Sequence, residues 1–111
     1  MHAPKELEFS VELQDVIVHH LRFSSSVVPG RVFSVEAHNG DVVCTVSGTV
    51  PAAVNGVYSF PVKIDESNGP KTSMKSTQML ALSLNKSYSG GPAASFVYMR
   101  TFKLSDSGSG R

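Results

Sequence analysis

Strict alternation of apolar and polar residues is the feature that most limits what this chain can fold into. Within Lys5–Leu13 every second residue from Leu7 onward is apolar, and most of the residues between them are glutamates. A period of two places the two sets on opposite faces of an extended chain, so a half-buried β-strand is predicted here. The same alternation recurs in Arg31–Ala37, Val57–Ile64 and Ser95–Leu104.

Turn-forming residues separate the predicted strands. Asn39-Gly40 and Asn55-Gly56 favour tight turns, because asparagine and glycine tolerate the positive φ angles that hairpins need. Further strands are predicted at Val16–Phe23, at Val42–Val50 and from about Met79 to Leu84. Pro61 cannot donate a ladder hydrogen bond, so its strand is predicted to be an edge or to carry a bulge. Loops are predicted at Ser24–Ser26, Pro29-Gly30, Asp65–Pro70 and Asn85–Ala94.

These segments predict an all-β fold with six or seven short strands and no helix. The length favours a small antiparallel barrel of five or six strands, similar to an oligonucleotide-binding (OB) fold. An immunoglobulin-type sandwich is disfavoured because the chain has no tryptophan and a single cysteine. Residues 1–104 are expected to form one domain, and residues 105–111 a disordered Gly/Ser tail.

Charge and cysteine content constrain the setting. The net charge is +1, but residues 1–20 carry four acidic side chains and one lysine, whereas the remainder carries nine basic and five acidic ones. A local basic face is therefore one interpretation, and ordinary surface charge is the other. The single cysteine excludes an intrachain disulfide. No segment is long and apolar enough to span a membrane as a helix, so we expect a cytoplasmic protein without a membrane partner.

Motifs for catalysis are not found in the sequence. It has neither a phosphate-binding Gly-rich loop ending in Lys-Ser/Thr nor a Gly-x-Ser-x-Gly elbow. Cys44 lies among valines and is interpreted as a buried hydrophobe rather than a nucleophile. His19 and His20 are adjacent, so on a strand they would face opposite ways and make a poor metal site. We therefore expect no enzymatic activity, cofactor, metal or small-molecule substrate.

Basic and aromatic residues interleave along several predicted strands and loops. Proteins that bind single-stranded nucleic acid use cations to follow the phosphates and aromatic rings to stack on the bases. Phenylalanines at such positions equally suit a hydrophobic core, and tyrosines suit either place. The candidate nucleic-acid-binding residues are Arg22, Arg31, Phe33, Tyr58, Lys63, Lys71, Lys75, Tyr88, Tyr98 and Arg100.

Two segments resemble a known family. Residues 54–64 read VNGVYSFPVKI and are followed by Asn68-Gly69-Pro70, and residues 29–35 read PGRVFSV. Together they resemble the small single-stranded-DNA-binding proteins of filamentous bacteriophages. The resemblance implies a five-stranded OB-like barrel, a symmetric homodimer and cooperative coating of single strands during phage DNA replication. It further implies that Arg22, Arg31 and Phe33, and with them Tyr58, line the DNA groove.

A second resemblance keeps the fold and changes the setting. The segment Val43–Tyr58 is similar to the OB-like N-terminal domain of RecD-type helicases. That similarity implies an accessory domain of a larger protein.

The leading hypothesis is sequence-tolerant binding of single-stranded DNA by a homodimer. The alternatives are a protein–protein interaction module and a structural or coat subunit, neither of which binds nucleic acid. The position of the basic residues distinguishes them. If Arg22, Arg31, Lys63 and Arg100 share a concave face with tyrosines, DNA binding is favoured. If they are scattered, a protein partner is favoured.

Overall fold

A computed structural model describes residues 6–90 and 99–106, which form strands joined by short turns. An all-β fold, as predicted, is confirmed for this part of the chain, which contains no helix able to cross a membrane. The described strands are β1 (Leu7–Asp15), β2 (His19–Val27), β3 (Val32–Asn39), β4 (Val42–Thr49), β5 (Val57–Asn68), β6 (Thr72–Ser83), β7 (Lys86–Gly90) and β8 (Met99–Asp106).

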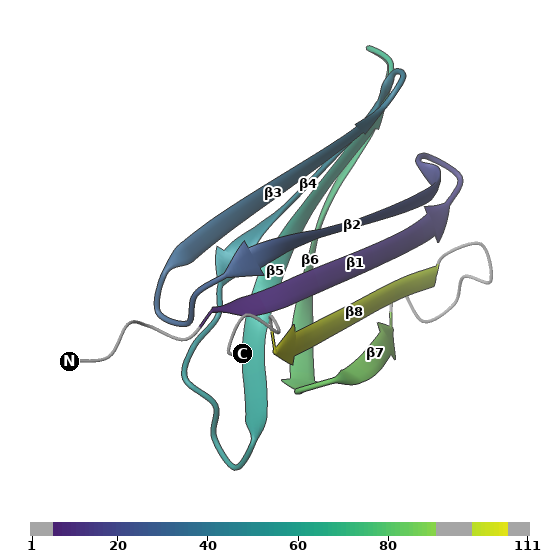
Figure 1. Ribbon diagram of the computed structural model, residues 1–111. Helices are drawn as coiled ribbons and strands as arrows, with labels where there is room; N and C mark the ends of the chain where they lie inside the picture. Colours follow the sequence, from purple (N-terminus) through teal and green to yellow (C-terminus); the bar gives the residue numbers. More distant parts are fainter. Residues whose placement is uncertain (1–5, 91–98, 107–111) are drawn as a thin grey trace.

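The described strands form two antiparallel sheets, which lie as two layers in Figure 1. Sheet A has the order β2-β1-β8-β7, and sheet B has the order β3-β4-β5-β6. Within residues 6–90 and 99–106 no ladder joins the sheets, so the closed five- to six-stranded barrel expected from the sequence is not found. The arrangement is a β-sandwich with four strands in each layer.

Alternation in the sequence places the core between the layers. In β1 the residues Leu7, Phe9, Val11 and Leu13 are all buried, whereas Glu8 is exposed. Rings from four strands meet in the centre of the sandwich. The centroid of the Phe9 ring lies 5.3 Å from that of Phe33, 6.3 Å from that of Phe60 and 6.1 Å from that of Phe102. Offset and edge-to-face pairs of this kind stabilise a core beyond the area they bury.

The two Asn-Gly sites form tight turns, as predicted. Gly40 and Asp41 connect β3 to β4, and Gly40 has a φ of 63°. Before β5, Val54 and Val57 exchange two backbone hydrogen bonds of 2.8 and 3.0 Å around Asn55 and Gly56. Both of these central residues have positive φ angles, 53° and 79°. This geometry is the one that Asn-Gly turns adopt most readily.

Several predicted strand boundaries are wrong, because polar residues that were expected to form loops instead pair with a neighbouring strand. β2 runs through Ser24–Ser26, which were expected to be a loop, and the turn lies instead at residues 16–18. β5 continues to Asn68 and β6 starts at Thr72, because all twelve residues of one strand pair with the other. Lys86–Gly90 was also expected to be a loop but forms β7 on the edge of β8.

The position of Pro61 differs from the prediction. β5 is an interior strand between β4 and β6, not an edge. However, its ladder with β4 ends at the pair Gly48–Val62, so at Pro61 only the ladder with β6 continues. Proline is tolerated there because one side of the strand has no ladder partner. At the other end of the chain, β8 extends to Asp106, two residues beyond the predicted domain boundary.

Candidate functional site

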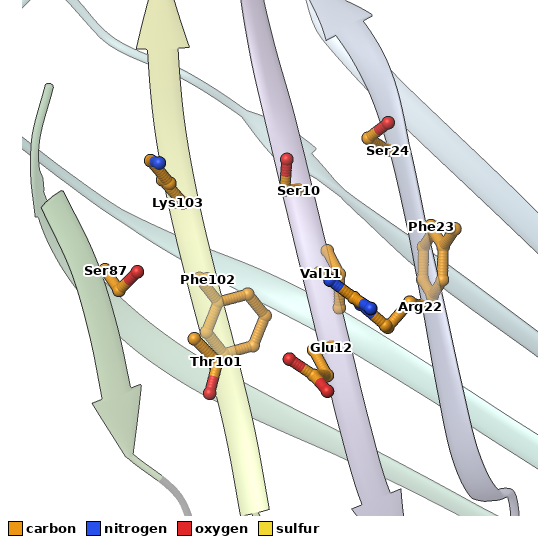
Figure 2. A pocket seen from close by; sticks show the side chains of 10 residues that line it. All are labelled: Ser10, Val11, Glu12, Arg22, Phe23, Ser24, Ser87, Thr101, Phe102 and Lys103. Carbon is orange, nitrogen blue, oxygen red and sulfur yellow. The ribbon is translucent and has the colours of Figure 1, made fainter. Parts of the chain in front are cut away.

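The outer face of sheet A contains a shallow hollow of about 520 Å³. Figure 2 shows the Arg22 side chain extending from β2 across β1, with Glu12, Thr101 and Lys103 on the same face. Serines 10, 24 and 87 complete its polar lining. The face is hydroxyl-rich.

Acidic side chains offset the cations on this face. Glu12 Oε2 lies 2.7 Å from His20 Nε2, and Ser24 donates a 3.3 Å hydrogen bond to Glu8 Oε2. Both glutamates therefore lie on the same surface as Arg22 and Lys103. Two cations against two carboxylates do not produce the positive field that attracts a polyanion.

The outer face of sheet B has a different character at the end where β3 begins. Val32 pairs with Thr49 across the β3–β4 ladder, and Pro61 pairs with Met79 across the β5–β6 ladder. We call these four residues the apolar patch. Val32 is 80% exposed and Met79 is 63% exposed. Val32, Thr49 and Pro61 also line a hollow of about 400 Å³, whose exposed lining is largely apolar but includes the charged side chain of Lys63.

Three predicted lysines lie together on the β5–β6 hairpin. Lys63 and Lys75 are exposed on the outer face of sheet B, with Asp65 directly opposite Lys75. Lys71 is exposed in the turn between the two strands. This hairpin therefore carries a small positive strip on its outer face, whereas its tyrosine, Tyr58, packs against the core.

Phe33 and Arg100 lie inside the molecule and do not form part of an accessible site. Phe33 is 7% exposed, and its ring packs against Phe9 and Phe60. Arg100 is 2% exposed and donates hydrogen bonds to Gln78 Oε1 at 3.1 Å and to Ser76 Oγ at 3.0 Å. A base or phosphate could reach either side chain only if the sheets separated.

The other predicted residues are dispersed. Arg22 lies on sheet A, and Arg31 is exposed in the connection between β2 and β3. Tyr58 and Tyr88 are half-buried and pack against the core. Tyr98 lies outside the described residues. The basic and aromatic side chains predicted to form one groove are thus divided between two outer faces, a loop and the interior.

A cluster of buried charges was missed at the sequence level. Asp15, Glu66 and Arg100 are 6%, 2% and 2% exposed, and come from β1, β5 and β8. The signal was present, because Glu66 continues the alternation of Val62 and Ile64. Likewise Arg100 lies on the same face of β8 as the buried Phe102 and Leu104. Position in the pattern therefore indicated burial more reliably than residue type did.

Within the described part of the chain, the carboxyl groups in this cluster are poorly satisfied. Neither oxygen of Glu66, nor Asp15 Oδ2, has a partner in standard hydrogen-bond geometry. The pKa of Glu66 is raised to about 8, with burial as the largest cause and with the hydrogen-bonding carboxyl and like charge of Asp15 contributing to the same shift. Arg100 acts in the opposite direction. Glu66 is consequently protonated at neutral pH.

The interior position of Cys44 agrees with its interpretation as a buried hydrophobe. The side chain is 0% exposed in β4, opposite Glu66 in the β4–β5 ladder. The pKa of the Cys44 thiol is raised to about 12, mainly by burial and in smaller part by the charge of Glu66. The thiolate needed for nucleophilic attack is therefore scarce.

Among the described residues, no group of three or more histidine, cysteine or acidic side chains could hold a metal ion.

Comparison with known proteins identifies no similar protein. No protein-family model, curated protein or solved structure matches the chain.

Proposed function

We propose that this chain is a non-catalytic β-sandwich that associates with a second copy of itself through the apolar patch on sheet B. The observation that carries the proposal is the exposure of Val32 and Met79 on one outer face, beside a largely apolar hollow. Exposed apolar groups that gather on one surface are typical of interaction sites.

The chemistry of the patch suits a protein better than a small ligand or nucleic acid. Val32, Pro61 and Met79 offer apolar surface, and Thr49 offers a single hydroxyl. An outer sheet face of this kind can pack against another sheet, as the two layers already do inside the sandwich. A second copy is the partner we infer, because most soluble oligomers are symmetric homo-oligomers.

The distribution of basic residues supports a protein partner over single-stranded DNA. Arg22 and Lys63 lie on outer faces of different sheets, and Arg100 is buried. DNA binding by electrostatics and stacking needs cations and rings on one accessible track. The predicted set does not form such a track.

The test is the oligomeric state measured by sedimentation velocity over a range of micromolar concentrations. The wild-type chain is expected to dimerise, and Met79→Asp is expected to remain monomeric, because a charge would be buried in the interface. Met99→Asp is the matched control, since Met99 is also exposed, at 52%, but lies on β8 of sheet A. A monomeric wild type, or a dimer unaffected by Met79→Asp, would contradict the proposal.

The lysine strip of the β5–β6 hairpin supports a second candidate, weak electrostatic binding of single-stranded DNA. Its test is fluorescence anisotropy of a labelled oligothymidine at low and moderate salt. Binding that weakens steeply with salt, and that is lost in Lys63→Ala/Lys75→Ala but retained in Lys103→Ala, would favour it. Absence of binding at low salt would exclude it.

A further inference from the structure

We propose that the interior of the sandwich contains a proton-binding site, in which Glu66 holds a proton against Asp15 and releases it at alkaline pH to loosen the β1–β2 turn. The site rests on three buried side chains from three strands: Asp15, Glu66 and Arg100. It is independent of the self-association proposed above, because none of the three lies in the apolar patch.

The number of charges explains why one proton is bound. Arg100 supplies one positive charge, whereas Asp15 and Glu66 would supply two negative charges if both were ionised. A buried uncompensated charge is costly, and the cheapest remedy is to neutralise one carboxyl group. One proton on Glu66 leaves the cluster neutral and gives it a donor that can face Asp15 Oδ2.

Among the residues that the structure describes, the other side chains near Glu66 do not provide an alternative neutralising charge. Cys44, opposite on β4, is uncharged when its thiol is protonated. Met74, opposite on β6, carries no charge. His19 lies across from Asp15 in the β1–β2 ladder, but it is exposed. Asp65, next to Glu66 in β5, faces the outer side.

The turn between β1 and β2 is held by the same cluster. Asp15 Oδ1 accepts hydrogen bonds from the backbone N–H groups of Ile17 at 2.8 Å and Val18 at 2.9 Å. Asn68, two residues after Glu66 in β5, donates a 3.0 Å hydrogen bond to the carbonyl of Ile17. If Glu66 ionises, its charge repels the carboxylate that organises this turn, so the turn is the element expected to respond.

The direction of the pH effect follows from linkage. The folded-state pKa of Glu66, about 8, exceeds the ordinary value of 4.5 expected in the unfolded chain. Its contribution to stability is therefore complete below the unfolded value and is lost as pH rises through the folded value. Between the two values, the unfolding equilibrium constant is expected to rise about tenfold per pH unit from this group alone.

The first experiment is a side-chain carboxyl NMR titration of the full chain. Glu66 is expected to titrate well above the ordinary glutamate value of 4.5. In Asp15→Asn the Glu66 midpoint is expected to move down, because a like charge is removed while Asn can still accept the Ile17 and Val18 hydrogen bonds. A Glu66 that titrates at the ordinary value of 4.5 would overturn the proposal.

The second experiment tests the coupling to the turn. Hydrogen-exchange protection of the Ile17 and Val18 amides, corrected for intrinsic exchange, is expected to fall as pH passes the Glu66 midpoint. Glu66→Gln, which resembles the protonated carboxyl, is expected to abolish that fall, whereas Glu6→Gln and His19→Gln are expected to retain it. Protection that stays constant across the Glu66 titration in the wild type would overturn the coupling.

Discussion

At the scale of single residues, Gly48 shows how closely β4 approaches the neighbouring strand β5 within sheet B. A Cβ atom at this position would lie 2.8 Å from the carbonyl oxygen of Pro61 and 3.4 Å from the ring of Phe33. The first contact is with backbone, which cannot rotate away as a flexible side chain could. Glycine is therefore required here for space rather than for an unusual φ angle.

Gly48→Ala is expected to lower the free energy of unfolding by about 1–3 kcal/mol, because the added methyl group overpacks this region. Ser47→Ala is the matched control, because Ser47 is adjacent to Gly48 and its side chain faces outward. The effect of this variant is expected to stay within about 0.5 kcal/mol. Chemical denaturation of both variants checks this. Equal effects would show that β4 and Pro61 move apart without cost.

Arg100 and Arg22 were predicted to share one role, and the structure gives them different environments. Arg100→Ala is expected to cost about 3–5 kcal/mol, because it leaves Asp15 buried without a counter-charge. Arg22→Ala removes an exposed side chain and is expected to change stability by less than about 0.5 kcal/mol. The midpoints of urea unfolding measure both, and similar midpoints would contradict the buried cluster.

At the scale of elements, the sequence predicted strands well where core residues alternate with polar ones. β1 and β3 were recognised this way, because one face of each packs on the core. The first half of β6 was missed, since Met74, Ser76 and Gln78 face inward without forming an apolar pattern. β7 was missed because its Ser-rich sequence resembles a loop, and only its ladder with β8 makes it a strand.

The candidate site was less predictable than the strands. Lys63 and Lys75 are exposed on the outer face of sheet B. Which surface they share depends on how the two sheets stack, and that is set by contacts distant in sequence. The apolar patch was missed because Val32 and Met79 look like ordinary strand residues until their exposure is known.

The turn before β5 provides a prediction at this scale. Gly56→Ala places a Cβ at a φ of 79°, which is expected to cost about 1–2 kcal/mol. Asn55→Gly keeps the same backbone geometry accessible and serves as the control, with a smaller change expected. Thermal unfolding distinguishes the two, and a neutral Gly56→Ala would mean that this turn can adopt another conformation.

At the scale of the whole molecule, the described strands follow one another in an almost unbroken meander. Each strand lies beside its neighbours in sequence, and β8 pairs with β1 to complete the circuit. The ladders are interrupted only between β2 and β3 and between β6 and β7, so in this part of the chain the circuit opens into two sheets. The expected closed barrel is not found in this part of the chain because of these two interruptions.

The pairing of β1 with β8 brings Leu7 directly opposite Asp106. The first and last described strands therefore lie side by side, with the start of β1 next to the end of β8. A circular permutant with these ends joined by a short linker, and with new termini at the exposed Gly40-Asp41 turn, should regain the same circular dichroism spectrum and cooperative unfolding. The same proximity would let the sandwich be inserted into a surface loop of a host protein without forcing that loop apart.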